Sequence, residues 1–149
     1  MRVGGRTLNE TGLNALVAGQ AGTPVALVTG DENTCRQCVE TLGAVDTVVV
    51  KWAVGRLAAR SLHPEEARTR IREGAKQAVE GRERFKPFTL AAPYRLEVDL
   101  LNTAMADAAS LMPGTARPSP RTVAFETSEV LTMFRALLAI SKLGGTVAS

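Results

Sequence analysis

The sequence predicts an α/β domain with a mixed, partly parallel sheet and helices packed on it. Two short apolar runs, at 24–30 and 46–51, enclose a segment with helical spacing, which is the strand–helix–strand order of a parallel pair. A third segment, 94–100, alternates apolar and charged residues as a strand with one wet face does. Apolar residues make up 45% of the 149 residues and charged residues 22%, so one core is expected and we treat residues 1–149 as a single domain.

The first third of the chain supplies a hairpin, two helices and the two apolar strands. Gly4-Gly5 tolerates the positive φ of a tight turn, so residues 3–8 are expected to contain the end of a hairpin. Asn9 is a suitable N-cap for a helix that begins with Glu10. Asp31 is expected to cap the helix that joins the apolar strands, and both strands are expected to be buried on both faces.

The remaining elements follow from caps, breakers and periodicity. Pro64 occupies the first position of a long helix with an exposed basic stripe of Arg68, Arg72 and Lys76. The alternating strand is expected to be antiparallel or at an edge. That long helix is expected to end at about Glu80. A connection at 85–93, a short helix at 102–111, a turn at 118–121 and a strand at 122–126 are expected to follow. Thr127 or Ser128 is expected to cap a last helix, which ends after Leu143 at Gly144-Gly145.

Charge and hydropathy exclude several classes of protein. The net charge is +3, but acidic and basic residues are interspersed, which predicts no nucleic-acid surface. No stretch approaches the roughly 20 apolar residues of a membrane span, and the N-terminus lacks the apolar core of a signal peptide. We therefore expect a cytoplasmic protein that contacts no membrane and keeps its cysteines reduced.

The single histidine limits the possible chemistry. This chain alone cannot form a His-rich zinc site, and any Ser-His or Cys-His pair would have to use His63. His63 precedes Pro64 at a helix start, where a cap or a surface loop is its expected role. His63 is thus a weak candidate for a catalytic residue, and the chemistry is carboxylate-based, shared with another chain, or absent.

Cys35 and Cys38 form a CxxC pair after a predicted strand. Helix N-termini lower thiol pKa values, so a redox role is one interpretation. The other interpretation, which we favour, is a pair of small buried side chains at helical spacing, because both lie inside the predicted helix.

Two further pairs are weak candidates for a site. Lys51 is expected to end a buried strand, and Arg56 follows closely in the sequence. Ligands of doubly wound sheets gather beyond such strand ends. Each of the two side chains is therefore expected either to contact an anion or to form an ordinary salt bridge. Glu10 and Asn14 lie one helical turn apart and suit a metal ligand with a supporting amide. Spacing alone favours a simpler role for Glu10, the stabilisation of a helix N-terminus.

A succession of short motifs resembles the zinc-dependent D-aminopeptidases of the dipeptide-transport (DppA) type. The motifs span nearly the whole chain in the family's order. They are Asn9-Glu10-Thr11-Gly12-Leu13-Asn14-Ala15, Gly19, Pro24-Val25, Val28-Thr29-Gly30-Asp31, Val49-Val50-Lys51, Gly55-Arg56, Leu62-His63-Pro64, Leu96-Glu97-Val98, Met112-Pro113-Gly114-Thr115 and Thr122-Val123-Ala124-Phe125.

The resemblance implies that Glu10 is a ligand in a two-zinc site. This role replaces stabilisation of the helix N-terminus, which the spacing alone favours. It also implies hydrolysis of short peptides with D-amino-acid N-termini by a closed ring of identical subunits. The match corresponds to the family's C-terminal half; the other metal ligands and the catalytic histidine lie upstream in the family, and His63 aligns to a loop. Asn9, where the family commonly has Gly, and Gly4, where Asn-Gly is usual, depart from the pattern.

Two functions remain open on these grounds. In the first, the chain is part of a D-aminopeptidase that contributes Glu10 and needs an N-terminal half or partner chain for activity, with Asn14, Lys51 and Arg56 as weaker substrate or supporting contacts. In the second, it is a non-catalytic assembly or binding module. Without that half, we expect exposed apolar surface and a tendency to associate.

Overall fold

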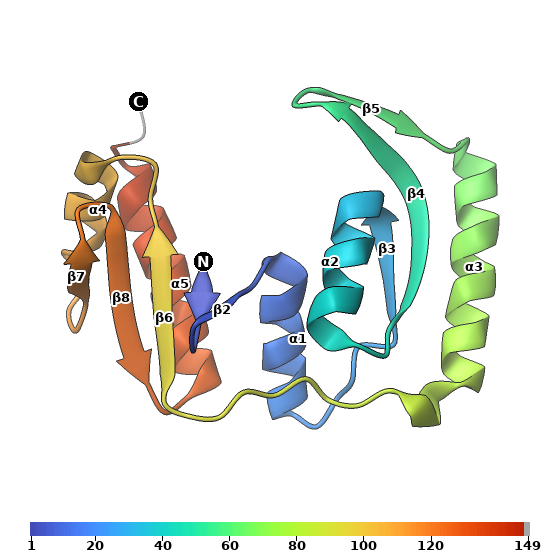
Figure 1. Ribbon diagram of the computed structural model, residues 1–149, viewed down its shortest axis with the longest axis horizontal. Helices are drawn as coiled ribbons and strands as arrows, with labels where there is room; N and C mark the ends of the chain where they lie inside the picture. The colour runs from blue at the N-terminus through green and yellow to red at the C-terminus, as the bar shows by residue number, and fades with distance from the viewer. Residues whose placement is uncertain (148–149) are drawn as a thin grey trace. The chain divides into compact units, whose positions relative to one another are not determined.

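The computed structural model describes residues 1–147 in two compact units. One unit comprises Met1–Asn9 with residues 89–147, and the other comprises Glu10–Phe88. Both combine helices with a β-sheet (Figure 1), which confirms the α/β fold class. The mixed, partly parallel sheet lies in the second unit, whereas the sheet of the first is wholly antiparallel.

The first unit is a five-stranded sheet with two helices. Its strands run in the order β2-β1-β6-β8-β7, and Gly4 and Gly5 form the β1–β2 turn with φ of 56° and 79°. The elements are β1 (Arg2–Val3), β2 (Arg6–Thr7), β6 (Tyr94–Asp99), α4 (Thr103–Ala109), β7 (Ala116–Ser119), β8 (Thr122–Thr127) and α5 (Val130–Gly145).

Strand β6 is central and antiparallel to both neighbours, which confirms the antiparallel alternative of the expectation and excludes the edge alternative. It pairs antiparallel with β1 on one side and β8 on the other. Its alternation correctly marks one wet face, because Tyr94, Leu96 and Val98 are buried while Arg95 and Asp99 are exposed. Alternation reports which face meets water and carries no information on which backbone edge is paired.

Helix α5 supplies much of the core of this unit. Met133 and Ile140 are fully buried on it, beside Leu96 of the sheet. The helix continues through Gly144-Gly145, and its N-cap position is Glu129, so neither expected end is correct. A Cβ on Gly144 would lie 3.3 Å from the Met105 carbonyl oxygen, and this glycine therefore permits close packing of α4 on α5.

An ion cluster stabilises the wet face of the same sheet. The Arg2 guanidinium donates to Glu97 at 3.0 Å and to Asp99 at 2.6 Å, and Thr122 donates to Asp99 at 2.7 Å. These contacts hold the pKa of both carboxyl groups below their usual values. They fix the short strand β1 to β6 at the point where only two residues pair.

The second unit is built on the sheet β3-β4-β5. Strands β3 and β4 are parallel, as the apolar runs predict, and β5 is antiparallel to β4. The elements are α1 (Glu10–Gln20), β3 (Leu27–Asp31), α2 (Glu32–Leu42), β4 (Asp46–Gly55), β5 (Ala58–Ser61), α3 (Pro64–Glu80) and a 3-10 turn η1 (Arg82–Arg84), followed by the expected irregular connection.

Helices α2 and α3 lie on opposite sides of β4 (Figure 1). The Cys35 thiol of α2 reaches the Val28 carbonyl oxygen, and Gly74 of α3 lies so close to Val48 that a Cβ would come within 2.6 Å of it. The cover is incomplete: Val28 is buried but Thr29 is exposed. Burial of both strands on both faces, which continuous apolar runs predict, is therefore wrong in this unit.

Sequence patterns missed the β4–β5 hairpin and strand β7. Strand β4 continues past Lys51 to Gly55, and the chain turns at Arg56-Leu57 into β5. All residues of 53–61 are exposed. Because neither face of this ribbon packs on a core, the segment has no alternation of apolar and polar residues to reveal a strand.

Within residues 1–147, no helix is long and apolar enough to cross a membrane. Several large apolar side chains are nevertheless exposed. Leu57 is 96% exposed and Val54 is 75% exposed, both on the β4–β5 hairpin.

Gly19 tests the packing of the second unit. A Cβ on this buried residue would lie 2.0 Å from the Phe88 carbonyl oxygen, a backbone atom that cannot rotate away. We expect Gly19→Ala to lower the free energy of unfolding by about 2 kcal/mol, measured as a lower midpoint in urea.

The matched control is Gly145→Ala, a helical glycine whose added Cβ meets no atom within 4 Å. It should leave the midpoint unchanged or raise it slightly, because alanine favours helix. Equal stability of the two variants would show that Phe88 does not constrain α1.

Candidate metal and substrate site

Glu10 begins α1, three residues after strand β2 ends at Thr7. Its side chain is exposed, and within residues 1–147 it makes no hydrogen bond or ion pair. A carboxylate at this position suits the helix dipole, and nothing on the protein occupies its oxygens. The geometry therefore leaves both roles of Glu10 open, helix stabilisation and metal ligation.

Asn14 lies one turn after Glu10 and is also exposed. Residues four apart share a helix face, so the amide and the carboxylate project from the same side of α1. The opposite side of this helix is buried through Gly12, Leu16 and Gly19. Glu10 and Asn14 therefore share the solvent face of α1.

Lys51 lies within β4 and does not end it, which corrects the expected position. It pairs with Asp31 of β3 on one side and with Ser61 of β5 on the other, and its side chain is exposed. The register of β3 and β4 shifts between Gly30 and Asp31, at the carboxyl end of β3. Lys51 therefore stands where the parallel pairing stops, although the strand itself continues.

Arg56 and Lys51 line a common cavity of about 450 Å³. Arg56 reaches it from the β4–β5 turn, and Asp31 provides the only acidic side chain of the lining. The structure thus brings together two of the weak candidates from the sequence. Its other lining residues are Ala53, Gly55, Leu57, Ala58 and Ala59.

Asp31 is held by the helix that it caps. Its carboxylate accepts hydrogen bonds from the Thr34 amide at 3.0 Å and the Thr34 hydroxyl at 2.7 Å. These two bonds lower the pKa of Asp31, with a smaller contribution from the positive charge of Lys51. The carboxylate is therefore ionised and committed to α2, as the predicted N-cap requires.

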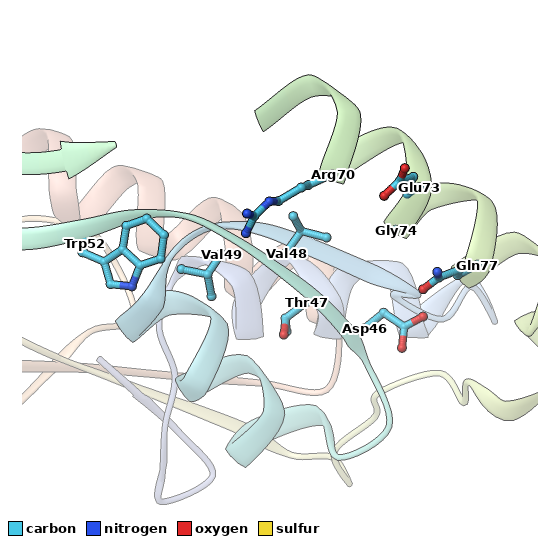
Figure 2. A pocket seen from close by; sticks show the side chains of 9 residues that line it. All are labelled: Asp46, Thr47, Val48, Val49, Trp52, Arg70, Glu73, Gly74 and Gln77. Atoms are coloured by element: carbon cyan, nitrogen blue, oxygen red, sulfur yellow. The ribbon is translucent and has the colours of Figure 1, made fainter. Parts of the chain in front are cut away.

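A second cavity of about 440 Å³ lies between β4 and α3 (Figure 2). Asp46, Thr47, Val48, Val49 and Trp52 come from the strand, and Arg70, Glu73, Gly74 and Gln77 come from the helix. Its charged groups are partly engaged elsewhere, since Arg70 pairs with Glu66 and Asp46 with Arg84. Sequence reasoning did not find this cavity, because helical and strand periodicities do not show which faces will meet.

The remaining candidates have structural roles. The His63 ring nitrogen accepts from the Glu65 amide at 3.4 Å, which confirms the cap at the start of α3. Cys35 and Cys38 are unpaired and only 3% and 1% exposed, and burial raises the pKa of the Cys35 thiol. A raised pKa and burial make a thiol unreactive, so the structure favours small core side chains over a redox pair.

The part of the chain that the structure describes holds no group of three or more His, Cys, Asp or Glu side chains able to bind a metal ion. A zinc site needs three or four protein ligands. Glu10 can therefore supply one ligand, and a complete site requires donors from elsewhere.

Comparison with known proteins decides the family. A family model described as D-aminopeptidase matches residues 1–139. This chain belongs to the D-aminopeptidase family. A curated member, the D-aminopeptidase of Bacillus subtilis (strain 168), is 32% identical over 139 residues, which cover 93% of this chain and 51% of that protein.

The fold of this chain matches a solved structure over nearly its whole length. The match is to the Zn-dependent D-aminopeptidase DppA from Bacillus subtilis, a self-compartmentalizing protease, with a TM-score of 0.95 and 30% identity. It covers 99% of this chain and 54% of the solved one. The chain thus spans about half the length of the relatives that it matches.

The cap of α2 tests the electrostatics around the Asp31 cavity. We expect Asp31→Ala to lower the free energy of unfolding by about 1 kcal/mol at pH 7, as loss of an N-cap does. Because folding lowers the pKa of Asp31, its contribution is complete above the usual pKa and is lost as the pH falls through the folded value. The difference from wild type should therefore shrink below about pH 4.

Asp31→Asn is the control, because asparagine caps a helix without titrating. Urea unfolding from pH 7 to pH 3 distinguishes the variants. An alanine penalty that stays constant down to pH 3 would contradict an ionised cap.

Proposed function

We propose that this chain is one part of a zinc-dependent aminopeptidase that hydrolyses short peptides with D-amino-acid N-termini. The observation that carries the proposal is the match to B. subtilis D-aminopeptidase over nearly all of this chain and about half of that protein. The relative's zinc dependence supports a metal mechanism for the complete enzyme. Residues 1–149 act as one domain of it in this proposal.

Glu10 is the residue that we propose as a zinc ligand. Its donor chemistry fits, because carboxylate oxygens bind zinc and this carboxylate has no competing partner within residues 1–147. One carboxylate holds zinc weakly, and the described residues offer no larger donor set. The remaining ligands and the catalytic groups then come from the part of the enzyme that this chain does not match.

With Glu10 as one of its ligands, a zinc ion in such a site would supply an activated water and a Lewis acid for the scissile carbonyl. This chain's contribution is positional. Helix α1 is anchored by buried Leu13 and Leu16, which fixes the direction of the Glu10 carboxylate at its first residue. Asn14, on the same face, is placed to hydrogen-bond that carboxylate or the substrate, and Lys51 and Arg56 offer positive charge to an anionic group.

The proposal includes partners and a compartment. An N-terminal half or a separate partner chain completes the site, and identical copies assemble as the self-compartmentalizing relative does. Nucleic acid and membranes are not among the proposed partners. We place the protein in the cytoplasm, where unpaired cysteines such as Cys35 and Cys38 stay reduced.

The second candidate is a non-catalytic assembly or binding module that keeps the family fold. In this candidate the chain uses its folded surface without a metal ion, and residues 1–147 hold no multidentate metal group. The two candidates differ in one respect that can be measured, the activity recovered when the missing half is supplied.

Reconstitution tests the first candidate. The chain is mixed with a polypeptide that carries the unmatched half, zinc is added, and release of D-alanine from D-Ala-D-Ala is followed. We expect activity that Glu10→Ala lowers at least about 100-fold, because loss of a metal ligand weakens zinc and removes its chemistry. Bound zinc should fall in parallel.

Glu32→Ala is the matched control. Glu32 is an exposed glutamate that begins α2 as Glu10 begins α1, so both variants lose the same helix-dipole interaction. It should keep full activity and zinc. If both variants lose activity equally, Glu10 acts only on the helix; if no complex and no activity form, the non-catalytic module is correct.

The chain without its partner provides a separate prediction. One carboxylate binds zinc weakly, so the isolated chain should hold less than one equivalent after gel filtration and should not cleave D-Ala-D-Ala. Elemental analysis and the same D-alanine assay measure this. Zinc-dependent cleavage by the isolated chain would overturn the shared-site proposal.

A further inference from the structure

The cavity that extends from Lys51 to the turn of the β4–β5 hairpin has the composition of a small anion site. Its volume of about 450 Å³ falls within the range of about 300–1,000 Å³ that small-molecule sites occupy. Two of its lining side chains, Lys51 and Arg56, are cationic, and the others apart from Asp31 are uncharged. Three alanines and a glycine leave the backbone close to the cavity, so a peptide could lie against the hairpin.

Lys51 and Arg56 are unused by the fold. Neither makes a hydrogen bond or ion pair with another residue in 1–147. Several other arginines of this unit are engaged, although Arg68 is not: Arg36 pairs with Glu40, Arg70 with Glu66, and Arg60 stacks on Trp52 with 4.6 Å between its guanidinium carbon and the ring centroid. The two cations at the cavity are therefore available to a ligand.

Asp31 offsets part of this positive charge, because its carboxylate stays ionised while both of its oxygens accept from Thr34, at 3.0 and 2.7 Å. The same charge repels an anion from the Lys51 side of the cavity and so directs it toward Arg56. The guanidinium of Arg56 can form two parallel hydrogen bonds to a carboxylate, whereas Lys51 adds a point charge.

Glu10 and the lining of the cavity belong to the same unit of the structure. Figure 1 shows the first turn of α1 and the carboxyl end of β3 toward the same end of this unit. Glu10 begins that turn, and Asp31 ends that strand beside Lys51. Ligands of α/β sheets gather outside the carboxyl ends of parallel strands.

We infer that this cavity binds the C-terminal carboxylate of the peptide substrate through Arg56 and Lys51. The inference rests on the proposed function. In a dipeptide, the carboxylate is the one charge at the C-terminal end that every side-chain variant shares, so a site for it selects by length and not by sequence. The enzyme should therefore prefer short peptides with a free C-terminus over the same peptides as amides.

Equilibrium binding to the chain itself tests this without catalysis, because every residue lining the cavity belongs to this chain. D-Ala-D-Ala and D-Ala-D-Ala amide are titrated into the metal-free chain and followed by NMR. The acid should bind about tenfold more tightly, as expected for a hydrogen-bonded charge pair, and Arg56→Gln should abolish the difference. Lys51→Gln should reduce it.

Arg68→Gln is the matched control. Arg68 is an exposed cation on α3 that lines neither cavity and has no partner in residues 1–147, so its variant keeps the net charge of Arg56→Gln. It should retain the acid preference. Arg56→Lys, which keeps the charge but not the fork, should retain part of it.

The outcomes separate the inference from the proposed function. Equal binding of acid and amide, or a preference that survives Arg56→Gln, overturns the carboxylate site. Inorganic phosphate that competes as strongly as the peptide acid would show a general anion site and also overturns it. A reconstituted complex that hydrolyses neither compound would overturn the proposed function while leaving the binding result to decide the site.

Discussion

The parallel pairing of β3 and β4 is the constraint on which the second unit depends. Parallel strands cannot be joined by a tight turn, so α2 must cross between them, and Asp31 is both the last residue of β3 and the cap of that helix. The same pairing sets Asp31 beside Lys51. One backbone arrangement therefore determines the crossover helix and the charge at the carboxyl end of the sheet.

Local signals in the sequence predicted most of this arrangement. Caps at Asp31 and His63 and the proline at the first turn of α3 each act within a few residues, so their positions can be predicted without knowledge of the tertiary structure. The β4–β5 hairpin could not be predicted in this way. Its residues are exposed on both faces, so the sequence lacks the alternation of apolar and polar residues by which a half-buried strand is recognised.

Contacts between residues far apart in the sequence could not be predicted from local patterns, for a different reason. Gly74 and Val48 meet because α3 returns to the sheet after the hairpin, and Gly144 meets Met105 because two helices pack. A glycine is ambiguous in sequence, since it can end a helix or permit close contact. Glu10 was similarly ambiguous by spacing alone, and the family resemblance, not helix periodicity, distinguished it from other first-turn acids.

The chain can carry only part of a metal and substrate site and still be well packed. Glu10, Lys51 and Arg56 are exposed and form no hydrogen bond or ion pair within residues 1–147, so none of them contributes appreciably to folding through such contacts. The core instead rests on apolar residues such as Leu16, while the α2 cap rests on Asp31. The proposed contacts of Glu10, Lys51 and Arg56 are therefore separate from the interactions that stabilise the fold, and substitutions at Glu10 or Arg56 can report on binding without disturbing it.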